Sequence, residues 1–270
     1  ALPILPADTC MRWALALSLM CSATVAQAAT VWVGRFPAGA SGLPEPWRVQ
    51  QLDARVAPTR YTLKTWNGVV AIEAVAERSM ALLGRPLEVD LEATPHLCWL
   101  WRVDAPLVTA DMRTKAGDDY AARVYVSFKV APEALGLATR AKLALARSIY
   151  GDQVPDAALN YVWDNRQPVG TLMPNAYTDR TRMIVLRSGA GDAGAWVVER
   201  RDVAEDFKRA FGDLPAQLGG IALASDTDNT GERARAGFAE FRFVSRDETC
   251  AAPDPATKRD DRVAPDRSER

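Results

Sequence analysis

The chain has 270 residues, of which 48% are hydrophobic and 25% are charged, and its formal net charge is −1. Balanced acidic and basic residues provide no basic surface for nucleic acid or for an anionic membrane, so we expect neither as a partner. Between two atypical ends, the remaining length suits one domain with a sizeable core.

The first 28 residues are typical of a secretory signal. Met11 and Arg12 begin a short charged region, and the apolar run 13–20 is too short to span a bilayer comfortably. Ala26 and Ala28 supply the small residues that signal peptidase requires. We therefore expect cleavage after Ala28, a mature chain without a transmembrane span, and a periplasmic or secreted protein. The alternative is an N-terminal membrane anchor.

Residues 29–246 show short apolar or alternating runs separated by turn residues, which predicts strands. The run 97–103 is apolar on both faces, as expected for a central strand, and Asn67-Gly68 marks a hairpin. The predicted strands are 30–33, 47–51, 59–64, 69–76, 88–91, 97–103, 123–128, 159–163, 181–187, 195–199, 221–224 and 236–243.

Two helices interrupt the strands, over 133–149 and 202–211. In the first, Leu137, Ala141 and Leu145 recur at four-residue spacing and predict an apolar stripe. The second opens with a capping-box pattern. Many short strands with two helices favour a mainly β fold, a single jelly-roll-like (galactose-binding-like) β-sandwich with two inserted or peripheral helices, over alternating βαβ units.

The mature chain keeps Cys98 and Cys250. An exported pair could form a disulfide, but Cys98 lies in an apolar run where a lone cysteine behaves as a small hydrophobe. We therefore favour two unpaired cysteines. Residues 247–270 are rich in proline and charge, so we expect a disordered tail.

The chain contains a single histidine, His96, which any Ser-His-Asp or Cys-His arrangement would have to use. Its place at the start of an apolar run favours a position at a strand start, and no Gly-x-Ser-x-Gly turn accompanies it. Zinc-ligand spacing is absent as well. The segment 189–194 (GAGDAG) lies between two predicted strands and predicts a hairpin turn rather than a phosphate loop.

Oxygen-bearing side chains gather between the last two predicted strands. Asp226, Asp228 and Asn229 have the alternating spacing that a calcium ion favours, so we name Asp226 and Asp228 as candidate Ca²⁺ ligands. The alternative is a tight turn without any ion.

A second acidic pair, Asp118 and Asp119, precedes the strand that begins with Arg123. Adjacent residues point to opposite sides, so we expect the two carboxylates to have different roles. One could cap a turn, while the other faces a site or pairs with Arg123. A loop held by Asx-type hydrogen bonds is the alternative.

The tryptophans divide into two groups. Trp99 and Trp101 lie two residues apart on one predicted strand and therefore share a face, which favours the core. Trp163 stands beside polar residues that include Asn165, and an exposed indole in such company is how many proteins bind a sugar ring. A core position is the alternative for Trp163.

Five blocks of the chain resemble, in order, an exported bacterial family catalogued as domain of unknown function 3047. The blocks are CWLWRVD (98–104), KAGDDYAARVYVSF (115–128), NYVWDNRQPVGTLMPNAYTDRTRMIVLRSG (160–189), WVVERRDVAEDFKRAFG (196–212) and ASDTDNTGERARAGFAEFRF (224–243). The resemblance implies a secreted or periplasmic β-sandwich without an established activity. The last block also resembles jelly-roll carbohydrate-binding modules.

We hypothesise an exported, non-catalytic module that binds a carbohydrate or another cell-envelope ligand, with no catalytic residue and no cofactor except Ca²⁺. The alternatives are a carboxylate-based glycoside hydrolase, using Asp118 or Asp119 with Asp226 or Asp228, and a structural or assembly protein of the envelope. The oligomeric state is not predicted. The candidate ligand-binding residues are Asp118, Asp119, Arg123, Trp163, Asn165, Asp226, Asp228 and Asn229.

Overall fold

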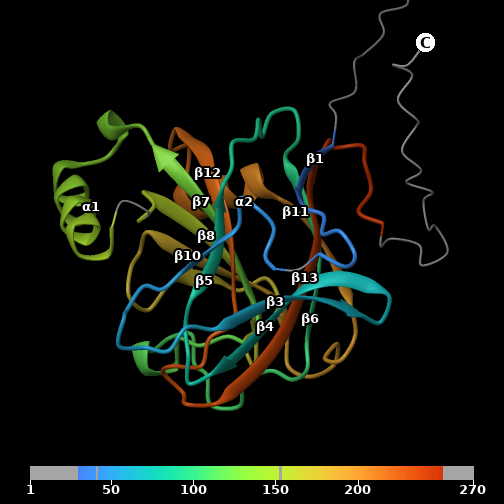
Figure 1. Ribbon diagram of the computed structural model, residues 1–270. Helices are drawn as coiled ribbons and strands as arrows, with labels where there is room; N and C mark the ends of the chain where they lie inside the picture. The colour runs from blue at the N-terminus through green and yellow to red at the C-terminus, as the bar shows by residue number, and fades with distance from the viewer. Residues whose placement is uncertain (1–29, 41, 152–153, 252–270) are drawn as a thin grey trace, which may run out of the picture.

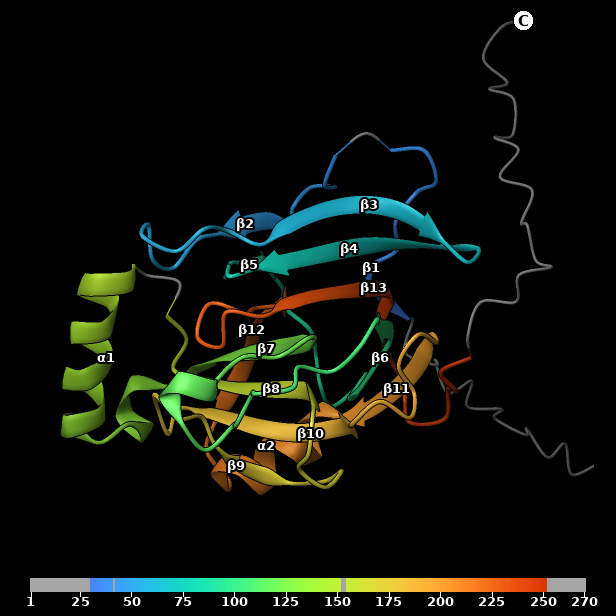
Figure 2. The same ribbon diagram turned by 90° about the horizontal axis from the view of Figure 1, so that it is seen from below.

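A computed structural model describes residues 30–40, 42–151 and 154–251. The predicted signal segment and residues 252–270 of the predicted tail lie outside the described residues. Within the described residues the chain forms two β-sheets that pack face to face, with two α-helices at their margins (Figures 1 and 2).

The first sheet has six strands in the described residues, in the order β11-β6-β13-β4-β3, with β1 paired to β13. All of its pairs are antiparallel. Its strands are β1 (Val31–Gly34), β3 (Arg60–Trp66), β4 (Val69–Glu77), β6 (His96–Val103), β11 (Val197–Asp202) and β13 (Arg233–Val244).

The second sheet has seven strands in the described residues, in the order β2-β5-β12-β7-β8-β10-β9. Its pairs are antiparallel except for β8 and β10, which run parallel. Its strands are β2 (Arg48–Gln50), β5 (Leu82–Pro86), β7 (Arg123–Val130), β8 (Ala157–Asp164), β9 (Leu172–Pro174), β10 (Thr181–Ser188) and β12 (Ala216–Ala224).

The chain repeatedly crosses from one sheet to the other, between β1 and β2, β2 and β3, β4 and β5, β5 and β6, β6 and β7, β10 and β11, β11 and β12, and β12 and β13. This alternation confirms the predicted mainly β, jelly-roll-like sandwich. It also corrects the prediction for 189–194, because this segment joins β10 to β11 and these strands belong to different sheets. The segment is a crossing loop and not a hairpin turn.

The predicted strands are confirmed with one exception. The segment 88–91 is not a strand, because Asp90 starts a turn in which its Oδ1 accepts the backbone N–H of Glu92 at 2.9 Å. The neighbouring strand β5 was not predicted, since it contains Gly84 and Pro86, residues that strands disfavour. The short strand β9 was not predicted either.

The helix α2 (Val203–Phe211) forms where the capping-box pattern predicts a helix. Asp202 caps its first turn, where Oδ1 accepts the N–H of Glu205 at 3.0 Å as the capping-box pattern predicts. The helix then packs against β6, β8 and β11.

The helix α1 (Leu137–Tyr150) stands beside the sandwich at one end in both views (Figures 1 and 2). The helix itself is confirmed, but the predicted stripe is not buried, because Leu137 is 81% and Leu145 63% exposed. Leu143 is the buried leucine of the helix. Among the described residues, no helix combines the length and apolar character needed to cross a bilayer.

An aromatic cluster fills the space between the sheets. Trp99 of β6 stacks on Phe241 of β13 with 6.2 Å between ring centroids, and lies 5.5 Å from Tyr161 of β8. Trp101 lies 5.6 Å from Trp163 of β8. All five side chains are at most 1% exposed, which confirms the predicted core position of Trp99 and Trp101. Truncating one such ring costs about 3–5 kcal/mol of stability.

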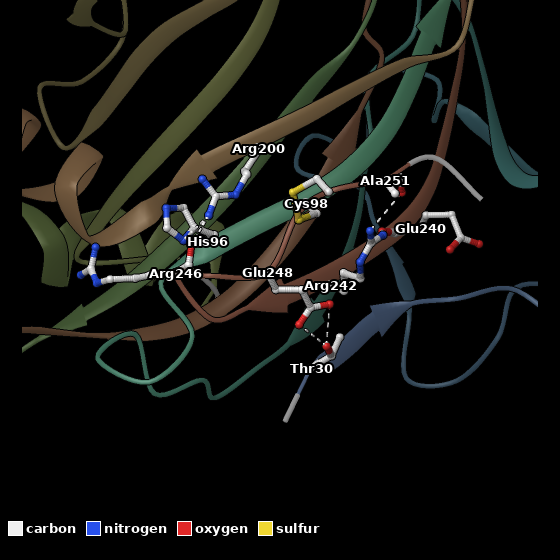
Figure 3. The surroundings of a disulfide bond; sticks show 10 residues. Thr30, His96, Cys98, Arg200, Glu240, Arg242, Arg246, Glu248 and Ala251 are labelled. Atoms are coloured by element: carbon white, nitrogen blue, oxygen red, sulfur yellow. Dashed lines mark hydrogen bonds between the residues drawn. A yellow bond between two sulfur atoms is a disulfide. The ribbon is translucent and has the colours of Figure 1, made fainter. Parts of the chain in front are cut away.

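A disulfide joins Cys98 to Cys250, so the expectation of two unpaired cysteines is wrong (Figure 3). Trp99 points into the core, and strand alternation therefore places Cys98 on the outer face of β6. The segment 247–251 reaches this face and is held there by further contacts. Glu248 accepts a hydrogen bond from the hydroxyl of Thr30 at 2.8 Å, so the folded region extends beyond residue 246.

The Cys250→Ser variant should unfold at lower denaturant, because the lost bond spans 152 residues and no longer restricts the unfolded chain. We expect a loss of about 2–5 kcal/mol in the free energy of unfolding. Urea unfolding, with and without a reducing agent, measures it. Under reducing conditions the wild type should match the variant, and equal midpoints without the reductant would contradict the prediction.

Candidate functional site

Two loops distant in sequence meet at one edge of the sandwich, because β7 and β12 are antiparallel neighbours. Arg123, the first residue of β7, pairs with Ala224, the last residue of β12. The loop that enters β7 (104–122) therefore lies beside the loop that leaves β12 (225–232). The N–H of Asp226 donates to the backbone oxygen of Tyr120 at 3.1 Å and joins the two loops. We call this region the loop edge.

The guanidinium of Arg123 lies at the centre of the loop edge and is only 3% exposed. It hydrogen-bonds to the carboxylate of Asp226, which is fully buried, and its Nη1 lies 3.9 Å from Oδ2 of Asp118. The rings of Tyr120 and Tyr125 lie 5.0 and 5.3 Å from the guanidinium carbon. The cation thus pairs with carboxylates and lies over two aromatic rings.

The adjacent residues Asp118 and Asp119 have different partners, as strand-like alternation predicts. Asp119 is fully buried and accepts hydrogen bonds from Nδ2 of Asn229 at 3.0 Å and from the N–H of Thr230 at 2.6 Å. Asp118 instead accepts from Nδ2 of Asn175, which lies 3.0 and 2.9 Å from its two oxygens. Asp119 therefore holds the 225–232 loop, and Asp118 holds the loop after β9.

A close approach of two backbone segments positions this acidic pair. The oxygen of Gly117 accepts the N–H groups of Asp111 and Asp119, each at 2.9 Å. A Cβ atom on Gly117 would lie 2.5 Å from the backbone nitrogen of Asp111, which is closer than atoms can pack. Glycine is therefore required within the short η1 helix (Lys115–Gly117) that precedes Asp118.

Burial dominates the electrostatics of the cluster. It raises the pKa of Asp226 well above its usual value, although the neighbouring Arg123 acts in the opposite direction. Burial and the nearby carboxylate of Asp119 raise the pKa of Asp228. Burial also raises the pKa of Asp118. The folded protein therefore disfavours full ionisation of this group of carboxyls.

The exposed rim of the loop edge includes Tyr177, whose side chain is 56% exposed. Its hydroxyl lies 3.2 Å from Oδ1 of Asn229 and 3.2 Å from the backbone oxygen of Lys115. The N–H of Tyr177 donates to Oδ1 of Asn175 at 2.9 Å. Sequence reasoning missed Tyr177 and Asn175 because it missed β9, the strand that directs their loop to this edge. The phrase Asn175-Ala-Tyr177 between two strands was the available signal.

The structure brings six of the eight candidate residues together at the loop edge: Asp118, Asp119, Arg123, Asp226, Asp228 and Asn229. Trp163 and Asn165 do not face its rim. The indole of Trp163 is 1% exposed and donates its N–H to the backbone oxygen of Gly189 at 3.0 Å, so the expectation of an exposed ring is wrong. Asn165 uses its Nδ2 to hold the 104–122 loop through the backbone oxygen of Ala110 at 2.9 Å.

His96 occupies the first position of β6, as predicted. Burial, with the nearby cation of Arg200, lowers its pKa. Its Nε2 lies 3.7 Å from the carboxylate of Asp202 at the start of α2, away from the loop edge. His96 therefore has no part in the candidate site.

Replacing Arg123 by methionine should destabilise the protein by about 3–5 kcal/mol, because Asp226 would remain buried without its cation. Urea unfolding measures this loss. In the double variant Arg123→Met with Asp226→Leu the loss should be partly recovered, since both charges are then gone. Arg113→Met removes an exposed pair instead and should change stability by less than about 1 kcal/mol. Equal effects at Arg123 and Arg113 would contradict this account.

The Gly117→Ala variant should lose stability through backbone displacement at Asp111, by about 1–3 kcal/mol. Gly191 provides a matched control, since a Cβ there meets nothing within 4 Å and its φ is not positive. Thermal unfolding of both alanine variants tests the difference. If Gly117→Ala unfolds at the temperature of Gly191→Ala, the close approach does not constrain the loop.

Comparison with solved structures finds sandwich folds at low identity. A family 11 carbohydrate-binding module of a cellulosomal cellulase of Clostridium thermocellum is 8% identical, with a TM-score of 0.40 over 81% of this chain and 95% of that one. The xyloglucanase domain of the effector NopAA from Sinorhizobium fredii is 8% identical, with a TM-score of 0.37 over 74% and 93%. A family 30 carbohydrate-binding module of Clostridium thermocellum is 10% identical, with a TM-score of 0.36 over 82% and 96%.

At these TM-scores and identities, the likeness transfers neither ligand nor activity to this chain. No curated protein shows significant sequence similarity to it. A protein-family model does match, over residues 45–242, which is well over half of the chain and includes the whole loop edge. The chain belongs to the family described as "Protein of unknown function (DUF3047)".

Proposed function

We propose that the protein is an exported, non-catalytic module that binds a carbohydrate or another hydroxyl-rich ligand of the cell envelope at the loop edge. The observation that carries this proposal is the exposed ring of Tyr177 beside the amides of Asn175 and Asn229. An aromatic face beside directed hydrogen-bonding groups is the combination that binds sugar rings.

The two amides are held in place before any ligand arrives. Nδ2 of Asn175 donates to Asp118, and Nδ2 of Asn229 donates to Asp119. Both carboxylates are buried, at 6% and 0% exposure, so neither amide is free to rotate into solvent. Groups fixed in advance reduce the entropic cost of binding, which supports a recognition role.

Export is supported by the disulfide between Cys98 and Cys250, because such bonds persist in oxidising compartments such as the periplasm. The signal-like segment 11–28 points to the same compartment, although it lies outside the described residues. The proposed location is therefore periplasmic or secreted.

Hydrolysis by the clustered carboxylates is the less favoured function. One carboxylate oxygen from each of Asp119, Asp226 and Asp228 lies within 4.8 Å of the other two. Retaining glycosidases separate their two carboxyl groups by about 5–5.5 Å, and inverting ones by about 6.5–9.5 Å. Asp119 and Asp226 are also fully buried, so a sugar has no direct access to either.

An assembly role has one supporting feature, the exposed leucines of α1. Leu137 and Leu145 are two exposed side chains eight residues apart, whereas interaction surfaces usually present larger continuous apolar patches. A binding module therefore remains the better proposal.

The proposal predicts that Tyr177→Ala weakens ligand binding at least tenfold, which corresponds to about 1.4 kcal/mol. A glycan array together with purified peptidoglycan identifies the ligand, and titration calorimetry then compares the variants. Tyr177→Phe keeps the ring and should retain most of the affinity.

Trp32→Ala is a matched control, because Trp32 is also exposed, at 42%, but pairs with Arg242 near the opposite end of β13 from the 225–232 loop. Its affinity should equal that of the wild type. Binding that survives Tyr177→Ala, or a wild type that binds no glycan, would refute the proposed function.

A further inference from the structure

Three carboxylates from two loops converge beneath the rim of the loop edge. Asp119 comes from the 104–122 loop, and Asp226 and Asp228 come from the 225–232 loop. One oxygen of each lies within 4.8 Å of the others. We propose that Asp119, Asp226 and Asp228 bind a divalent cation of the calcium class. The sequence suggested Asp226 and Asp228 for this role, and the tertiary structure adds Asp119.

Two buried oxygens in this trio lack any hydrogen-bond partner among the described residues. Asp226 is fully buried, and while its Oδ2 pairs with Arg123, its Oδ1 accepts no hydrogen bond there. Oδ1 of Asp228 is likewise buried and unpartnered within the described chain. A buried carboxylate oxygen without a partner is costly, and a cation would satisfy both.

The balance of charge in the cluster also favours a bound cation. The cluster contains four carboxylates, those of Asp118, Asp119, Asp226 and the half-buried Asp228, and one guanidinium, that of Arg123. If all were ionised, four negative charges against one positive charge would leave three uncompensated. A divalent cation would offset two of them. Arg123 does not block the site, since it contacts the other oxygen of Asp226.

The donor chemistry selects the type of cation. The trio presents oxygen ligands only, which suits hard cations rather than zinc or copper. Oxygens that share one calcium ion at 2.3–2.6 Å lie at most about 5 Å apart, so the trio can surround such an ion without large movement. Magnesium requires a more regular octahedral arrangement and retains its water, so it fits this irregular set less well.

A cation here would join the 104–122 loop to the 225–232 loop. Asn229, which follows Asp228, contacts Tyr177 at the exposed rim. The ion would therefore stabilise the surface proposed to bind the ligand. The site itself does not depend on that proposed function, because its test uses no glycan.

The test uses the mature protein stripped with EDTA and returned to metal-free buffer. Calorimetry with CaCl₂ should show one ion per chain, and Ca²⁺ should raise the unfolding temperature more than Mg²⁺ does. The wild type should also sensitise Tb³⁺ luminescence, and Ca²⁺ should displace the Tb³⁺. This readout needs no variant and remains valid if a substitution prevents folding.

Asp228→Asn preserves the shape of the side chain and should weaken Ca²⁺ binding at least tenfold. In EDTA this variant should unfold at or above the wild-type temperature, because one repelling charge is gone, and in Ca²⁺ the order should reverse. Asp213→Asn is the control. Asp213 follows α2, its side chain is 87% exposed, and it pairs with Lys208 of that helix. Its calcium affinity should match that of the wild type.

Three results would overturn the proposal. The first is a wild type that neither binds Ca²⁺ nor gains stability at about 10 mM, above the range of weak extracellular sites. The second is wild-type affinity in Asp228→Asn. The third is an equal response to Mg²⁺ and Ca²⁺, which would refute the calcium assignment.

Discussion

The loop edge depends on one buried ion pair, between Arg123 at the start of β7 and Asp226 after the end of β12. Because the partners belong to different segments, the pair joins two loops that the β7–β12 register brings together. Asp118 and Asp119 add hydrogen bonds that extend the same network to the rim. Among the described ion pairs, Arg123 is the cation that lies beside Asp118 and Asp226.

The buried residues and the exposed residues of the loop edge differ in their chemistry. Of the carboxylates that looked suited to acid–base catalysis, Asp119 and Asp226 are fully buried, Asp118 is buried and Asp228 is half-buried. Asp119 accepts hydrogen bonds from backbone and amide groups. The groups that meet solvent at the rim include the ring of Tyr177 and the amide of Asn229, both exposed. Such an arrangement favours binding over bond cleavage, since a substrate bond must reach the reacting carboxyl groups.

Much of the candidate site could be predicted because acidic side chains that gather in polar loops indicate a binding site. Two acidic loops beside an arginine were recognisable as a site, and six of the eight candidates converge. Trp163 was misread because its polar neighbours follow it in the chain, while strand alternation turns its ring into the core. Tyr177 was missed because β9 has only three residues and carries too short a pattern to recognise.

Local sequence determined most of the strands, the helix cap at Asp202 and the Asn67-Gly68 turn, because each depends on residues close in the chain. It also determined that Asp226 and Asp228 would lie in a polar loop. Tertiary structure alone decided which sheet each strand joins, that Cys98 meets Cys250, and that Asp119 approaches Asp226. These contacts join segments far apart in the chain, and strand register with burial, rather than local pattern, brings them together.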